Sequence, residues 1–149
     1  NGVYTVYAMH IQLSDHGLKK GFPMNIIISN VSDQPLYQQI KEQIKAAILH
    51  AELKGGDLLP SIRALANDLH VSVLTTKRVY DELESEGFII TRAGKGTFVA
   101  PENLELLRES KRHLVEVKLT EAWETARSLG ISKSELYAMM DLLFEEDEN

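Results

Sequence analysis

The sequence predicts a mainly α-helical fold with one small β-hairpin. Apolar residues recur at the three- and four-residue spacing of helices along most of the chain, whereas residues 88–100 are rich in β-branched residues around glycines. A length of 149 residues admits one main domain and a small appendage. We expect an N-terminal segment of uncertain origin over 1–23, the main domain over 24–101 and a helical region over 102–149.

The first predicted helix follows a cluster of helix-starting residues. Ser32 or Asp33 is expected to cap it, Pro35 suits its first turn, and apolar residues then follow at helical spacing. Gly55 and Gly56 are expected to end this helix, since glycine readily adopts the backbone conformation that closes a helix.

Two shorter helices are predicted next. Pro60 and Ser61 begin the second helix, and a tight turn at 69–71 separates it from the third. Ser72 caps the third helix, which runs to about residue 86 and ends at Gly87. Three helices of this length and spacing indicate a helix-turn-helix.

A hairpin is expected directly after the third helix. The strand-favouring runs 89–91 and 97–99 flank Ala93-Gly94-Lys95-Gly96, where the glycines permit the chain to reverse. A hairpin in this position is a wing, so the main domain is predicted to be a winged helix-turn-helix.

Two helices are predicted after Pro101. The first ends at Gly130, and Ser132 with Glu135 forms a capping box that begins the second. Their exposed apolar residues need a partner surface, and self-association provides one. The alternative is that the pair packs back on the main domain. The residues expected at the dimer interface are Leu114, Trp123, Leu136, Met139, Met140, Leu143 and Phe144.

The charge is unevenly distributed along the chain. Residues 34–101 hold eight bases and eight acids, whereas residues 102–149 hold six bases and twelve acids, which accounts for the whole net charge of −6. A neutral main domain with its charges sorted by face can still attract phosphate, so the acidic total does not exclude a nucleic-acid partner.

The third helix has the charge order of a recognition helix. Ser72, Thr75, Lys77 and Arg78 lie in its first turns, and its acids come late, which is the reverse of the order that the helix dipole favours. A phosphate at the N-terminal end explains this order, since short polar and basic side chains there reach base edges and phosphates. The alternative is an ordinary amphipathic helix with arbitrary surface charges.

The hairpin tip has a backbone that another molecule can approach closely. Gly94 and Gly96 flank the cation Lys95, and Arg92 lies on the adjoining strand, so we expect contacts with phosphate or the minor groove. A glycine turn with a solvated lysine is the alternative. A nucleotide-binding P-loop is excluded, because it requires Ser or Thr directly after its lysine.

These segments resemble the GntR family of bacterial transcription regulators. The resemblance runs from about residue 35 to residue 100 and rests on LPSIRALANDLHVS, TTKRVYDELESEGFI and TRAGKGTFVA. It implies that Arg63 is a phosphate- and base-contacting arginine, that Ser72 and Thr75 are small polar contacts, and that Lys77 stands where a contacting arginine is common. Gly94, Lys95 and Gly96 fall at the tip of the family's wing.

Val73 departs from the family pattern, in which an arginine that reads DNA often follows the serine. Valine cannot donate a hydrogen bond but can contact a thymine methyl group. The wording VSVLTTKRVYDELE is similar to the YtrA-like subfamily, whose members have a short two-helix C-terminal region. This resemblance implies dimerisation through that region and repression of operons for ABC-type transporters.

We therefore predict a dimeric, sequence-specific DNA-binding regulator, a repressor of an inverted-repeat operator. The rival hypothesis is a protein-interaction module that uses the winged helix as a scaffold. The sequence names no small-molecule effector, although Met139 and Met140 are candidates to line a pocket.

Several other functions are not expected. Cysteine is absent, and His10, His16, His50, His70 and His113 lack the spacing of metal ligands, so no metal or cofactor is predicted. No pair of residues suggests catalysis. No apolar run approaches the roughly 18 residues of a membrane span, and no signal peptide is recognisable, so we expect a cytoplasmic protein.

Overall fold

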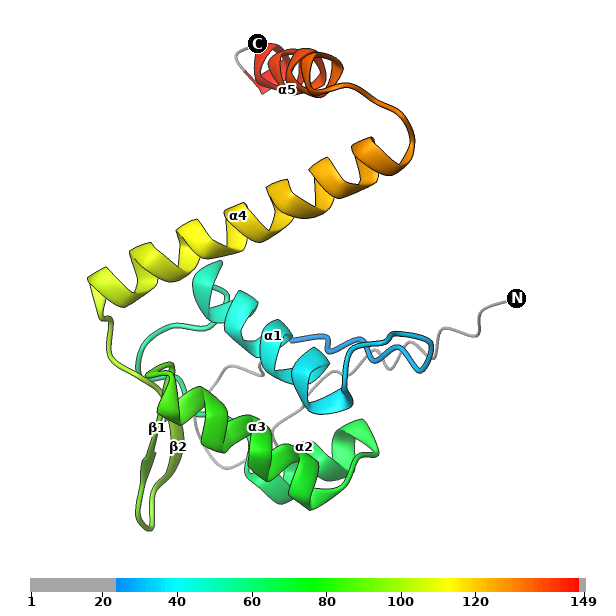
Figure 1. Ribbon diagram of the computed structural model, residues 1–149. Coiled ribbons are helices and arrows are strands. Elements are labelled where there is room, and N and C mark those ends of the chain that lie inside the picture. The colour runs from blue at the N-terminus through cyan, green and yellow to red at the C-terminus, as the bar shows by residue number, and fades with distance from the viewer. Residues whose placement is uncertain (1–23, 148–149) are drawn as a thin grey trace. The chain divides into compact units, whose positions relative to one another are not determined.

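The computed structural model describes residues 24–147, with side chains up to Glu145 (Figure 1). The predicted segment 1–23 lies outside the described residues, as do the last two residues of the acidic C-terminal end. The chain divides into two compact units after Glu102. The described residues form five helices and one antiparallel hairpin, which confirms the mainly α-helical fold class.

Three helices build the core of the first unit. They are α1 (Leu36–Leu49), α2 (Ile62–Leu69) and α3 (Val73–Ser85), and α3 contacts both of the others. Each helix turns one apolar face inward, as the helical spacing of its apolar residues predicts. Fully buried side chains on these faces include Ile40, Ile44, Leu65, Leu69, Val79 and Leu83. This core fixes α3 as the central helix of the unit.

The two ends of α1 differ from the sequence prediction. Neither Ser32 nor Asp33 caps the helix; Pro35 is the N-cap residue and makes no side-chain capping bond. The helix ends at Leu49, well before the predicted glycines, because Ala51 adopts a left-handed conformation with φ of 58°. This early reversal places Leu53 in the core at 3% exposure, and burial of an apolar side chain favours the turn.

The starts and ends of α2 and α3 confirm the predictions. Ser61 Oγ accepts a hydrogen bond of 3.1 Å from Ala64 N, and Ser72 Oγ accepts one of 3.0 Å from Thr75 N. Each serine therefore satisfies a first-turn amide that has no partner within its helix. The turn between the helices has His70 in a left-handed conformation, and α3 ends before Gly87, whose φ is 86°.

The wing contains a third chain segment that was not predicted from the sequence. Strands β1 (Ile89–Arg92) and β2 (Gly96–Val99) pair antiparallel, as expected. Residues 56–59 lie along the other edge of β2: Leu59 N donates to the Thr97 carbonyl at 2.8 Å, and Val99 N donates to the Asp57 carbonyl at 2.8 Å. The wing is thus anchored on the loop that precedes α2.

Residues 24–29 are held against α1 by two glutamine side chains. Gln43 bonds both the amide of Ile27 (2.8 Å) and its carbonyl (2.7 Å), and Gln39 bonds the amide of Ser29 (2.9 Å) and its carbonyl (3.1 Å). The alternate side chains of Met24, Ile26 and Ile28 are buried. We call this arrangement the glutamine clip. Its two side-chain amides bond the backbone N–H and C=O groups of an extended segment, as a neighbouring β-strand would.

The second unit consists of α4 (Leu104–Ser128) and α5 (Lys133–Asp147). Asn103 caps α4, and the predicted capping box begins α5: Ser132 N donates to Glu135 Oε2 at 2.8 Å, and Glu135 N donates to Ser132 Oγ at 3.2 Å. The bond from the Ser132 amide holds the pKa of Glu135 below its usual range. None of the described helices combines the length and apolar character that a bilayer-spanning helix needs.

Candidate nucleic-acid interface

The first turn of α3 presents the predicted small polar residues together. The hydroxyls of Ser72 and Thr75 lie 2.7 Å apart, and Ser72 Oγ also caps the helix. Val73 is half exposed beside them. Because each hydroxyl still has donor or acceptor capacity beyond these bonds, the pair can hydrogen-bond a further polar group while its orientation is fixed.

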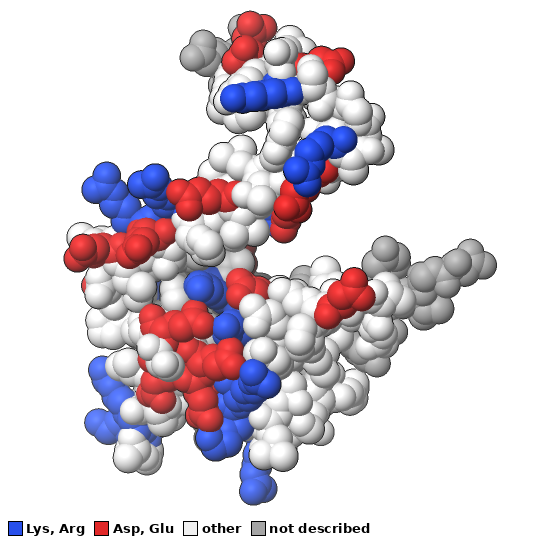
Figure 2. Space-filling view, viewed as in Figure 1, with Lys and Arg blue, Asp and Glu red and all other residues white. Residues whose placement is uncertain are grey.

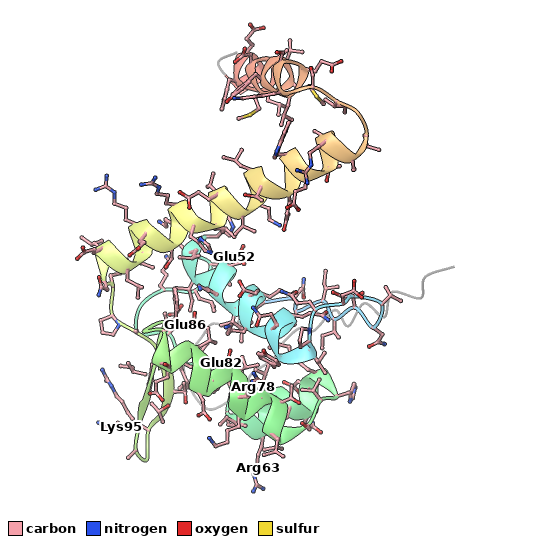
Figure 3. The ribbon with its side chains drawn as sticks, viewed as in Figure 1. Glu52, Arg63, Arg78, Glu82, Glu86 and Lys95 are labelled. Carbon is pink, nitrogen blue, oxygen red and sulfur yellow. The ribbon has the colours of Figure 1, made fainter. Side chains whose placement is uncertain are left out.

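Two cations extend from the first unit without an ion-pair partner among residues 24–147. Arg63 lies in the first turn of α2 and Lys95 at the tip of the wing, and both side chains point away from the helices (Figure 3). Both residues are exposed. An exposed cation without a protein partner retains its full charge for an external anion.

Lys77 and Arg78, the other predicted basic contacts on α3, already have acidic partners one turn away. Lys77 forms an ion pair with Asp81, and Arg78 Nε donates to Glu82 Oε1 at 3.0 Å. The Arg78 guanidinium also stacks on the Tyr37 ring of α1, 3.5 Å from its centroid. The two side chains are thus less available than Arg63 and Lys95, a difference that the sequence did not predict.

The wing tip depends on the predicted glycines. Gly94 has φ of 71° and Gly96 has φ of 118°, conformations that other residues rarely adopt. A Cβ at Gly96 would also lie 3.0 Å from Leu58 Cδ1. The guanidinium carbon of Arg92 lies 5.5 Å from the centre of the Phe98 ring, so this cation is held over the wing while Lys95 remains at the tip.

A row of ion pairs joins α1 to α3 and was not predicted. Lys41 Nζ lies 2.9 Å from carboxylate oxygens of both Glu82 and Glu86, and Lys45 Nζ lies 3.0 Å from Glu86. Burial alone lowers the pKa of Lys41, but its hydrogen bonds to the two glutamates raise it to about 12. Lys41 and Lys45 are four residues apart in the sequence, and so are Glu82 and Glu86. This spacing, which places each pair of like charges on one face of its helix, was the sequence signal available for the row.

Both glutamates of this row have a lowered pKa. Hydrogen bonds from Lys41 and then Arg78 lower the pKa of Glu82. Burial raises the pKa of Glu86, but hydrogen bonds from Lys41 and Lys45 outweigh it and lower the pKa overall. The carboxylates therefore remain charged partners for the lysines at neutral pH.

A separate contact fixes the wing to α3. The Thr91 amide donates to Glu84 Oε1 at 2.7 Å, so the backbone of β1 is bonded to α3. The late acids of α3 thus have structural partners, and they form an acidic patch that Figure 2 shows between regions of basic side chains. The reversed charge order of α3 is explained in part by these contacts.

The predicted dimer residues do not all lie in one place. Trp123, Leu136 and Met140 line a groove of about 460 Å³ between α4 and α5, together with Leu119, Lys133 and Tyr137. Leu114 and Met139 do not line it. Leu143 and Phe144 are 64% and 62% exposed. The second unit therefore presents both an apolar groove and an exposed apolar helix face.

The histidines do not gather into a metal site in the region that the structure describes, where no three potential ligands cluster. His10 and His16 lie outside this region.

Comparison with known proteins decides the family. The family model of bacterial regulatory proteins, gntR family, matches residues 36–99. The HTH-type transcriptional regulator YhcF of Bacillus subtilis is 38% identical over 105 residues, which cover 70% of this chain and 86% of YhcF. The chain belongs to the GntR family. The HTH-type transcriptional repressor YtrA of Bacillus subtilis is 34% identical over 106 residues, which cover 71% of this chain and 82% of YtrA.

A solved structure agrees with this membership. A GntR family transcriptional regulator from Listeria monocytogenes superimposes with a TM-score of 0.63 at 28% identity, covering 73% of this chain and 95% of that one. The expected resemblance to GntR and YtrA-like proteins is confirmed, and so is the winged helix-turn-helix. This protein is thus a DNA-binding transcriptional regulator, and the family to which it belongs consists of regulators.

Proposed function

We propose that this GntR-family protein is a repressor that binds an inverted-repeat operator as a homodimer. The observation that carries the proposal is the pair of unpaired cations, Arg63 before α3 and Lys95 after it, which extend outward from the elements on each side of the recognition helix. In a winged helix, these elements flank the helix that enters the major groove, so both cations are suited to phosphate or guanine contacts.

The remaining predicted contacts have distinct roles in this proposal. Ser72 and Thr75 set the register of the first turn of α3, and Val73 contacts a thymine methyl group. Lys77, which is paired with Asp81, is a weaker contact on the same surface, and Arg92 supports the wing. Gly94 and Gly96 let the wing backbone approach the DNA closely.

Dimerisation through the second unit is supported by its exposed apolar residues. Leu143 and Phe144 on α5, with the groove that Trp123 lines, present more apolar surface than a monomeric pair of helices usually exposes. A second copy of the chain covers this surface most economically, since a twofold interface uses the same patch twice. Two recognition helices related by a twofold axis require an operator with two inverted half-sites.

Repression is supported by the similarity to YtrA, whose name describes it as a repressor. The regulated operon is proposed to encode a transporter, as the YtrA-like resemblance implies. Bound dimers would act by blocking transcription.

Fluorescence anisotropy on labelled DNA from upstream of the gene, with scrambled DNA as the comparison, tests the proposal between about 50 and 200 mM salt. We expect selective binding that weakens steeply with salt and is lost in the double variant Arg63→Ala, Lys95→Ala. Lys111→Ala, an exposed lysine of α4, is the matched control and should bind as the wild type does. Absence of binding even at low salt would overturn the proposal in favour of a protein-interaction module.

A further inference from the structure

Two rows of side chains face each other along the seam between α1 and α3. Tyr37, Lys41 and Lys45 follow one another at four-residue intervals on α1. Arg78 and Glu82 on α3 and its C-cap residue Glu86 have the same spacing (Figure 3). Tyr37 stacks on Arg78, Lys41 pairs with both glutamates, and Lys45 pairs with Glu86. We call this arrangement the α1–α3 seam.

We propose that Tyr37 and Glu82 are positioning residues that hold the Arg78 guanidinium in place as a DNA phosphate contact. The inference rests on the proposed DNA-binding function and deepens it. It assigns a role in recognition to a residue of α1, a helix outside the helix-turn-helix, and it places Arg78 above Lys77 as the main anion contact of α3.

The charge of the α1–α3 seam supports this assignment. It contains three cations, Arg78, Lys41 and Lys45, and two anions, Glu82 and Glu86. Three cations thus share two carboxylates, which leaves the seam with a net charge of one positive. Lys77 differs, since it shares a single ion pair with Asp81 and their charges cancel.

The geometry of Arg78 supports it as well. Its Nε–H is given to Glu82 and one face of its plane is covered by Tyr37, yet the side chain remains 56% exposed. An arginine has five N–H donors in a planar fork, so the exposed part retains donors that suit a phosphate. A side chain that is already held in one orientation loses less conformational entropy when it binds.

The test is a double-mutant cycle on the full chain, with the labelled upstream duplex and its scrambled form as probes. The variants are Arg78→Ala, Tyr37→Leu and their combination, with Tyr37→Phe as the conservative control because it keeps an aromatic ring for stacking. Lys77→Ala is the matched comparison on the same helix. Thermal unfolding verifies that each variant folds.

We expect Arg78→Ala to reduce the slope of log K against log salt by about 0.9, the value for one lost phosphate contact. Tyr37→Leu should weaken binding about two- to fivefold in the wild-type background and have no effect in the Arg78→Ala background. Tyr37→Phe should bind as the wild type does, and Lys77→Ala should change the slope less than Arg78→Ala.

An unchanged salt slope in Arg78→Ala, or equal weakening by Tyr37→Leu in both backgrounds, would overturn the inference while leaving the proposed function intact. If Arg78→Ala fails to fold, Arg78→Lys replaces it. The slope of log K against log salt should then be retained, and Tyr37→Leu should weaken binding less than it does in the wild-type background. An equal weakening by Tyr37→Leu in both backgrounds would count against the inference. Loss of all binding by the folded wild type would instead overturn the proposed function itself.

Discussion

The two units of this protein differ in how completely they bury their apolar residues. In the first unit, α1, α2, α3 and the wing enclose a shared core of fully buried side chains. In the second unit, Ala126 is the one residue that is buried among those described, and large side chains such as Leu142, Leu143 and Phe144 are exposed on α5.

This difference shows that the two units meet the requirement for burial in different ways. The first unit satisfies it within one chain, as an independently stable domain does. The second unit cannot, because a single pair of helices has too little interior to cover its own apolar faces. Its stability is therefore tied to a further surface that covers its exposed apolar side chains.

The largest expected effect is loss of self-association in Leu143→Glu. A carboxylate at an exposed apolar position would be buried without a partner in the proposed dimer, and burial of an unpaired charge is strongly unfavourable. The molecular mass in solution should fall from dimer to monomer, as measured by light scattering. Ser134→Glu adds the same charge to α5 at an exposed polar site and should remain dimeric; equal masses for all three proteins would contradict the interface.

A core substitution should destabilise the first unit by about 2–5 kcal/mol. Leu83→Ala removes a side chain with 0% exposure on the inward face of α3 and leaves a cavity. Urea unfolding measures the change in the free energy of unfolding. Leu104→Ala, at a position that is 75% exposed on α4, should stay within about 0.5 kcal/mol of the wild type. Comparable losses at both sites would erase the contrast between the units.

Removal of a helix cap should lower stability by about 1 kcal/mol in either unit. The loss should spread over the whole of the first unit but stay local in the second. Ser61→Ala deprives the Ala64 amide of its acceptor in the cooperative first unit and should lower the stability of that whole unit. Ser132→Ala breaks the capping box and should mainly increase amide exchange in the first turn of α5. Hydrogen exchange of both variants distinguishes the two outcomes; global loss of protection in Ser132→Ala would mean that the units unfold together.

The smallest expected effect is an acid-dependent loss of stability in the first unit. Glu82 and Glu86 have lowered pKa values in the folded chain, so the unfolded chain binds protons more readily than the folded one. The contribution of both groups is present above pH about 4.5 and is lost as the pH falls through their lower folded values. Urea unfolding at a series of pH values measures this loss as a fall in the free energy of unfolding below pH about 4.5. Glu86→Gln should make that fall shallower. An equally steep fall in the variant would argue against the ion pairs as its source.

The elements whose ends are specified locally were predictable from the sequence. Ser61, Ser72 and the pair Ser132 and Glu135 satisfy amides within three residues, so their roles follow from short patterns. The end of α1 was not predictable in this way. It depends on the burial of Leu53 in the core, which is a tertiary contact, and this contact outweighs the preference for glycine at a helix end.

The candidate interface was predictable as a set of residues but not as an arrangement. Arg63 and Lys95 emerge where the motifs indicated, whereas the partners of Lys77 and Arg78 were missed. The α1–α3 seam joins residues about forty positions apart, so the four-residue spacing within each helix indicates a charged face but not which helices pair. The same holds for the bond from Thr91 to Glu84, which requires the wing to fold back on α3.

The glutamine clip has a consequence for the order in which the chain folds during synthesis. Ile27 and Ser29 leave the ribosome before Gln39 and Gln43, yet the two glutamines lie on one side only after α1 has become helical. Because α1 is itself packed against α3, the earliest described residues find their partners only after the helical core has assembled. Attachment of residues 24–29 therefore follows the formation of α1, although these residues are made before it.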